Sequence, residues 1–346
     1  MEELDPLHRG VLADPDDDAL RHVWADALIE RGDPLGEVIS LQLRAAEGPI
    51  TSAQDKRLRS LVAKHKNAWL GELTAIVQTR EGLTFDRGVL AACQIQVKKV
   101  DGLARATNHP LLAGLESIWF SDRFAHDPRI VDLLAAPVLG RLREIVCPGN
   151  NRVFPLLARL ERPLAASAIW LTTDHWLDSP TSIQDVDEAP GLPRLRHLGL
   201  TLNGEETWAT TLPIVDQLET LGITSPAPVQ HWLDRTRDLA KLTMLEIRRD
   251  WIPIQGITRS HFCLRFTRDD RGAWSRLAIE RVGSATEPML EGDLASLVET
   301  DIAQVTLEEE TIRPFVRRRF AHVAVDIGAP PARPFFARYA RGPLER

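Results

Sequence analysis

A short phrase of the form L-x-x-[LI]-x-[LIVF] recurs through the middle of this 346-residue chain and limits the possible folds more than any other feature. The clear copies are Leu115–Phe120, Leu142–Cys147, Leu195–Leu200, Leu218–Ile223 and Leu242–Ile247, with weaker copies at Ala92–Val97 and Ala166–Leu171. The fourth residues of successive phrases lie 23, 27, 24, 29, 23 and 24 positions apart. Leucine-rich repeats have periods of roughly 20 to 29 residues. Because one such unit cannot bury its own apolar face, neighbouring units must stack.

The segments between the phrases favour short helices. Residues 128–134, 153–160 and 210–215 are compatible with helix and lie close to prolines that divide the chain into units. Each unit therefore contains a strand, a turn and a short helix. We expect an α/β fold in which residues 49–260 form a leucine-rich-repeat-like solenoid, with a parallel sheet on one face and short helices on the other.

The region before the repeats predicts a helical hairpin. Asp14 and Pro15 are typical of the N-cap and the first position of a helix, and Gly32 is typical of its end. The apolar face of this helix is expected to consist of Leu20, Val23, Trp24, Ala27 and Leu28. Asp33–Pro34 then predicts the start of a second helix that closes against the first.

Residues 14–37 read D-P-D-D-D-A-L-R-H-V-W-A-D-A-L-I-E-R-G-D-P-L-G-E. This sequence resembles the bacterial repeat-companion domain, and the resemblance covers about residues 7 to 45. It implies a helical hairpin placed ahead of leucine-rich-repeat-like arrays, as in planctomycete and myxobacterial proteins, and it implies no catalytic residue. We therefore expect residues 1–48 to form an α-helical cap on the first repeat.

The repeat pattern is lost after Trp251. Phe262–Phe266 and Leu277–Ile279 flank Asp269–Gly272, an arrangement typical of a hairpin of antiparallel strands. Two more strands are expected within residues 303–307 and 322–327. Residues 261–346 are therefore predicted to form an irregular, β-containing end that covers the open edge of the sheet. Its tail, residues 330–346, either folds back on the array or acts as a docking peptide.

Composition disfavours several kinds of partner. A formal net charge of −7 provides no overall basic field for nucleic acid. No apolar run reaches the length of a membrane span, and the acidic N-terminus does not resemble a secretory leader. The three cysteines lie far apart and lack C-x-x-C spacing. We expect a cytoplasmic protein that binds neither nucleic acid nor membrane.

No cofactor or metal is expected either. The histidines occur singly, without the spacing of a metal site. Asp14, Asp16 and Asp18 resemble the start of a calcium loop, but Ala19 and Ala25 stand where such a loop needs glycine and glutamate.

No catalytic site is indicated. Cys147 has a conceivable base in His126, but its position in the repeat favours burial in the core. The chain has no nucleophile-elbow motif and no phosphate-binding glycine loop. An enzyme would require a site assembled from distant residues.

The residues between the core positions of each phrase are expected to face the concave side of the sheet. The fifth positions form one ladder: Gln96, Trp119, Val146, Trp170, Gly199, Gly222 and Glu246. The seventh positions form a second: Ser121, Pro148, Thr172, Thr201, Thr224 and Arg248. The candidate partner-binding residues are Trp119, Trp170, Gly199, Gly222, Glu246, Thr172, Thr201, Thr224 and Arg248.

Two alternatives exist for Trp119 and Trp170. As exposed aromatics they would anchor a partner, with the two glycines forming a shallow floor beside them. Alternatively, they pack beneath a neighbouring loop or the N-terminal helices. We expect a non-enzymatic scaffold that binds a protein partner through the concave face. The alternative function is that of a substrate or regulatory subunit of a neighbouring enzyme, such as a protease, engaged or cleaved in its C-terminal region.

Overall fold

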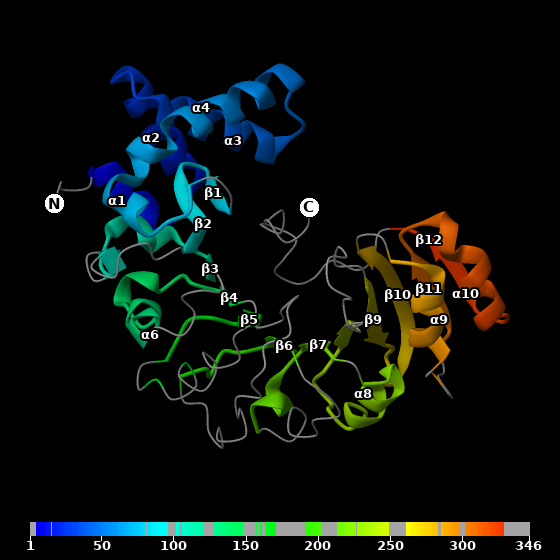
Figure 1. Cartoon of the computed structure of the whole chain (residues 1–346). Helices are drawn as coiled ribbons and strands as arrows, with labels where there is room; N and C mark the ends of the chain where they lie inside the picture. Colours follow the sequence, from blue (N-terminus) through cyan, green and yellow to red (C-terminus); the bar gives the residue numbers. More distant parts are fainter. Residues whose placement is uncertain are drawn as a thin grey trace. The chain divides into compact units, whose positions relative to one another are not determined.

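A computed structural model describes residues 5–14, 16–79, 82–95, 102–103, 106–120, 128–147, 157, 160, 163–170, 191–201, 213–225, 227–248, 261–282, 285–295, 297 and 302–328. The chain divides into two compact units, Met1–Arg143 and Glu144–Arg338. Both contain helices and strands, so the protein is a mixed α/β protein (Figure 1). Gln96, Ser121, Pro148, Thr172 and the tail from residue 329 onward lie outside the described residues, and the domain boundaries after residues 48 and 260 stay predictions. None of the described helices is long and apolar enough to cross a membrane.

The first unit begins with four helices: α1 (Pro6–Ala13), α2 (Asp18–Glu30), α3 (Pro34–Glu47) and α4 (Ser52–Leu70). Helix α3 begins after its N-cap Asp33, as predicted. The prediction that Asp14 caps the next helix is wrong, because Asp14 is the C-cap of α1 and Asp17 caps α2 by accepting a hydrogen bond from the Leu20 amide at 3.0 Å. The sequence prediction missed α1.

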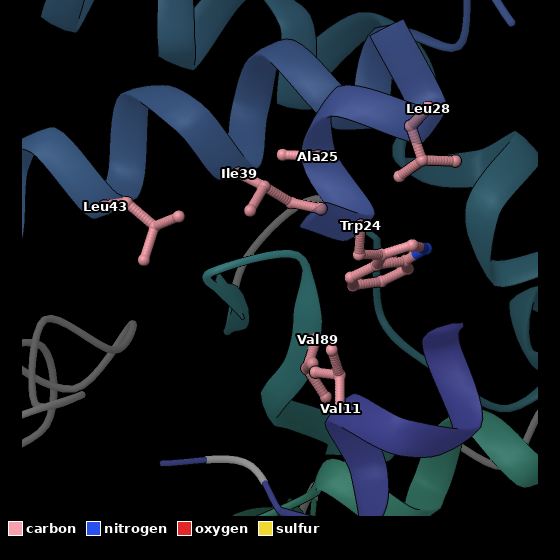
Figure 2. Close-up of a cluster of buried hydrophobic side chains, with 7 residues drawn as sticks. All are labelled: Val11, Trp24, Ala25, Leu28, Ile39, Leu43 and Val89. Atoms are coloured by element: carbon pink, nitrogen blue, oxygen red, sulfur yellow. The ribbon is translucent and has the colours of Figure 1, made fainter. Parts of the chain in front are cut away.

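The predicted apolar face of α2 is wrong at one position. Trp24 and Leu28 are buried, but 54% of the surface of Val23 is exposed. The buried side of α2 is instead centred on Trp24, Ala25 and Leu28, because α1 and α3 both pack on that side. Figure 2 shows the core they form: Val11, Trp24, Ala25, Leu28, Ile39, Leu43 and Val89.

Helix α3 is the central helix of this group. Ile39 and Leu43 face the core shared with α2, whereas Val38 and Leu41 form a second core with Leu61 of α4. Helices α2 and α4 therefore lie on different sides of α3 (Figure 1). A capping box between Thr51 and Gln54 starts α4.

A β-hairpin joins the helices to the first strands. Strand β1 (Leu83–Asp86) pairs antiparallel with β2 (Val89–Ile95), and β2 pairs parallel with β3 (Ser117–Phe120). The amide of the Gln42 side chain donates to the Phe85 carbonyl, and its oxygen accepts from the Gly88 amide at 3.1 Å. Gly88 has φ +84°, and a Cβ there would lie 2.4 Å from Ile39. Close packing of α3 on this turn thus requires glycine.

The first repeat phrase is displaced from its predicted register. Cys93, not Ile95, pairs with Ile118, and Gln94, not Gln96, pairs with Trp119. Strand β2 begins before the predicted phrase, and a phrase shifted two residues earlier places apolar residues at the same alternate positions. The sequence pattern alone therefore does not select between these two registers. The unit also contains η1 (Gly71–Ala75), η2 (Pro110–Gly114), α6 (Pro128–Leu134) and η3 (Pro137–Leu139).

In the second unit the strand order follows the sequence from β4 to β12. Strands β4 (Glu144–Val146), β5 (Ala168–Trp170), β6 (His197–Thr201), β7 (Thr220–Thr224) and β8 (Met244–Arg248) pair in parallel. The predicted phrases align at their fourth residues, since Ile145, Ile169, Leu198, Leu221 and Leu245 are successive partners. All five are 0% exposed. Helices η6 (Pro213–Gln217) and α8 (Val229–Arg235) lie between strands in the sequence.

The predicted C-terminal hairpin is confirmed. Strand β9 (His261–Arg268) pairs antiparallel with both β8 and β10 (Trp274–Val282), and β11 (Gln304–Leu307) and β12 (Ala324–Ile327) continue the sheet in parallel. Helices α9 (Glu287–Ala295), η7 (Glu310–Ile312) and α10 (Arg313–Arg319) separate these strands in the sequence.

Candidate functional site

The predicted partner-binding residues of the second unit form two rows across the sheet. Trp170, Gly199, Gly222 and Glu246 are successive strand partners, so the fifth-position ladder holds from β5 to β8. The seventh-position ladder holds from Thr201 through Thr224 to Arg248 on the same three strands. Trp119 belongs to the first unit and Thr172 lies outside the described residues.

Most members of these rows whose burial is described are buried, and so is Trp119 of the first unit, which corrects the expectation of an open face. Trp119 is 8% exposed, whereas Glu246 and Thr224 are each 2% exposed. Gly199 and Gly222 are buried as well. This burial favours the packed alternative for Trp119. Trp119 therefore does not act as an exposed anchor, and the predicted role of Trp170 stays a prediction because its side chain lies outside what the structure describes.

Side chains of two kinds alternate along β8, β9 and β10. On one face, Ile247, Leu264 and Ile279 belong to the apolar core and are at most 1% exposed. The other face, called here the polar face, is defined by three rows of strand neighbours: Met244, Thr267 and Arg276; Glu246, Arg265 and Ala278; Arg248, Cys263 and Glu280.

Ion pairs connect the middle and last rows of the polar face. Nε of Arg265 donates to Oε2 of Glu246 at 2.9 Å, and the same guanidinium is also paired with Glu280. A second cation, Arg248, lies 2.9 Å from Oε1 of Glu246. Two carboxylates and two guanidiniums thus form a continuous chain of charge-assisted hydrogen bonds across three strands.

The exposed fraction increases from the centre of the polar face to its rim. The side chains of Glu246 and Arg265 are 3% and 5% exposed, but those of Arg248 and Glu280 are 18% and 24% exposed. In the first row, Met244 and Thr267 are half-buried and Arg276 is exposed. A buried ionic centre with a partly exposed rim holds its surface groups in fixed positions, because their partners are on rigid strands.

The pKa of one carboxylate near the polar face is shifted from its ordinary value. Partial burial, together with the nearby carboxylates of Glu280 and Glu309, raises the pKa of Glu308. Glu308 follows β11 directly and is exposed, and Glu309 is 3.3 Å from Arg281. A raised pKa is a property of acid–base catalysts, but networks of surface charges produce it equally well.

The cysteines have the properties of core residues. Cys93, Cys147 and Cys263 are all buried. Burial raises the pKa of the Cys93 thiol to about 12 and that of Cys147 higher still, so neither forms a thiolate at neutral pH. Within the part of the chain that the structure describes, no group of three His, Cys, Asp or Glu side chains is arranged to hold a metal ion.

Sequence reasoning identified Glu246 and Arg248 but missed Arg265, Arg276 and Glu280. Arg265 alternates with apolar residues in Phe262-Cys-Leu-Arg265-Phe, and Arg276 and Glu280 occupy one face of β10. A charged residue at such a position indicates the second face of a sheet. That alternation was present in the sequence, but the pairing of Arg265 with Glu246 depends on the register between β8 and β9.

Two comparisons with known proteins identify no relative of this chain. A scan against protein-family models finds no match, and a search of curated proteins finds none either.

Proposed function

We propose that this protein is a non-enzymatic recognition scaffold that binds a protein partner through the rim of the polar face. The observation that carries this proposal is the ionic centre formed by Glu246 and Arg265, which holds the partly exposed side chains of Arg248 and Glu280 through ion pairs. Interfaces are enriched in arginine and methionine, and Arg248, Arg276 and Met244 lie together on the rim of the polar face.

The scaffold proposed is a leucine-rich-repeat-like array. Five parallel strands from β4 to β8 place equivalent, fully buried residues of each phrase side by side. This regular register supports stacked units of one repeating type. The buried position of the cysteines accords with a reducing compartment such as the cytoplasm.

We also propose that the N-terminal helices act as the cap that the repeat-companion resemblance implies. Gln42 of α3 binds the backbone of the β1–β2 turn on both sides, at Phe85 and Gly88. Nearby, Arg87 is 2.6 Å from Asp18 at the start of α2. These contacts support a role for the helices in covering the first strands.

Arg276 offers the sharpest test of the recognition surface. It is exposed on the rim, and no ion pair joins it to another described residue. Its replacement by glutamate reverses a charge without disturbing the buried centre. Arg271, in the turn of the same hairpin, is exposed but lies off the polar face, so Arg271→Glu is the matched control.

The experiment is affinity purification from native lysate with the tagged wild type, Arg276→Glu and Arg271→Glu, followed by quantitative mass spectrometry. We expect one protein to co-purify in stoichiometric amounts with the wild type and the control, and to fall at least about tenfold with Arg276→Glu. Equal recovery with both variants, or no stoichiometric partner at all, would contradict the proposal. Recovery of the bait in a shortened form would favour the protease-substrate alternative instead.

A further inference from the structure

Helix α2 presents an unusual outer face. Val23 and Ile29 are 54% and 49% exposed, and among the described residues only Ile327 is a comparably exposed large apolar side chain. Acidic groups flank them on the same side of the helix, at Asp26 and Glu30. No ion pair joins either carboxylate to another described residue. We call the face formed by Val23, Asp26, Ile29 and Glu30 the acidic face of α2.

Helix α4 presents the opposite charge. Lys56, Ser60, Ala63 and Lys64 are all exposed. Ser60 follows Lys56 by four residues, and Ala63 and Lys64 follow Ser60 by three and four, so all four lie on a single helical face. Arg59 is exposed beside them but is paired with Asp55 of the same helix. Neither lysine has an ion-pair partner among the described residues. We call Lys56, Ser60, Ala63 and Lys64 the basic face of α4.

The two faces complement each other but do not contact each other within this unit. Helix α3 packs against α2 through Ile39 and Leu43 and against α4 through Val38 and Leu41, so it separates them. The small side chains of Ser60 and Ala63 leave room between the two lysines for large apolar groups such as Val23 and Ile29.

We propose that the acidic face of α2 binds the basic face of α4 of a second copy of this chain. Such a contact joins two different surfaces, so it builds either head-to-tail assemblies or a two-fold dimer in which α2 of each copy meets α4 of the other. The contact involves one helix from each copy, so the association is weak and depends on salt. It uses a surface separate from the polar face, and it stands whether or not that face binds a partner.

The test is sedimentation analysis of the full-length chain up to about 1 mM, the range in which weak association is measurable. We expect the average mass to rise above the 38.7 kDa of one chain with concentration, and to return toward it at high ionic strength. A single species of monomer mass over the whole range would overturn the proposal.

Two double variants identify the surfaces. Lys56→Glu with Lys64→Glu makes both faces acidic, and Asp26→Lys with Glu30→Lys makes both basic. Each variant alone should associate at least about tenfold more weakly than the wild type, because like charges then meet. A mixture of the two variants should associate again. The acidic α2 of the first variant can then meet the basic α4 of the second, and the basic α2 of the second can meet the acidic α4 of the first. Failure of the mixture to associate would overturn the assignment.

Matched controls carry the same change of net charge at exposed positions elsewhere. They are Lys241→Glu with Arg317→Glu, and Asp270→Lys with Glu291→Lys. Both controls should associate as the wild type does, and loss of association in them would show a net-charge effect and not a specific contact. Val23→Ser with Ile29→Ser should weaken association about tenfold while leaving the circular dichroism spectrum unchanged. Unchanged association in this variant would show that Val23 and Ile29 do not contribute to the contact.

Discussion

Arg265 and Glu246 face each other across β9 and β8, with Nε of the guanidinium 2.9 Å from Oε2 of the carboxylate and both side chains at most 5% exposed. Taking two charges out of water is unfavourable, and their mutual attraction offsets that penalty only when the geometry is good and other hydrogen bonds complete the network. Arg248 and Glu280 supply those additional bonds. The pair therefore forms the fixed centre of the polar face.

Removal of Glu246 should destabilise the second unit more than removal of Glu280. Glu246→Ala takes a partner from both Arg248 and Arg265, and we expect a loss of about 3 kcal/mol in the free energy of unfolding. Glu280→Ala leaves Arg265 paired with Glu246 and should cost about 1 kcal/mol. Urea unfolding measures both. Equal losses would mean that the two carboxylates contribute alike and that Glu246 is not the centre.

Trp119 should behave as a core residue. It is 8% exposed, and its buried Nε1 has no hydrogen-bond acceptor among the described residues. Trp119→Ala should cost about 3–5 kcal/mol through the cavity it leaves. Trp119→Phe, which keeps much of the ring and removes the indole N–H, should cost less than about 1.5 kcal/mol. A Trp119→Ala variant with the stability of the wild type would show that this side chain is not packed.

The contact between α2 and α3 depends on Gly36. A Cβ at this position would lie 2.6 Å from the Ala25 carbonyl oxygen and 2.8 Å from the Ile29 amide nitrogen, both of which are backbone atoms. Gly36→Ala should therefore separate the helices and cost about 1–3 kcal/mol in the free energy of unfolding. Gly48→Ala is the control, since nothing lies within 4 Å of its Cβ position. Thermal unfolding that ranks the two variants in the reverse order would contradict this packing.

His8 should make the stability of the helical region depend on pH. Its ring stacks on Trp24 with 4.6 Å between centroids, and burial lowers its pKa, an effect that the Asp5 carboxylate partly opposes. Between that lowered value and the ordinary value of about 6.5, the unfolded chain binds a proton that the folded chain does not. Stability should therefore fall as the pH drops through about 6.5.

The matched variant is His8→Phe, which keeps a ring against Trp24 and cannot titrate. Its free energy of unfolding should change less between pH 7 and pH 5 than that of the wild type. His109 and His197 also have lowered pKa values through burial, so the informative quantity is the difference between the two proteins. Identical slopes would exclude His8 as a source of the pH dependence.

The sequence predicted the strands well because their signal is local. Each phrase places large apolar residues at alternate positions, and the residues at its fourth position, such as Leu198 and Leu221, do become strand partners. The N-cap Asp33 and the turn at Asp269–Gly272 could be predicted equally well from the sequence, since both depend on a few adjacent residues.

The remaining features depend on distant contacts. Val23 fits an apolar stripe on α2, but only the positions of α1 and α3 decide which side of that helix is covered. Glu246 was placed on an open face, although the burial of a strand face depends on segments far away in the sequence. Its partner Arg265 lies 19 residues later on an antiparallel strand, and a one-residue change of register would remove the pair.

Site-specific photo-cross-linking tests the proposed recognition surface most directly. A photoreactive residue in place of Met244 lies on the rim of the polar face, whereas one in place of Lys241 lies in the preceding turn. In native lysate, we predict that position 244 cross-links to one defined protein and position 241 does not. Equal products from both positions, or none from position 244, would contradict recognition through the polar face.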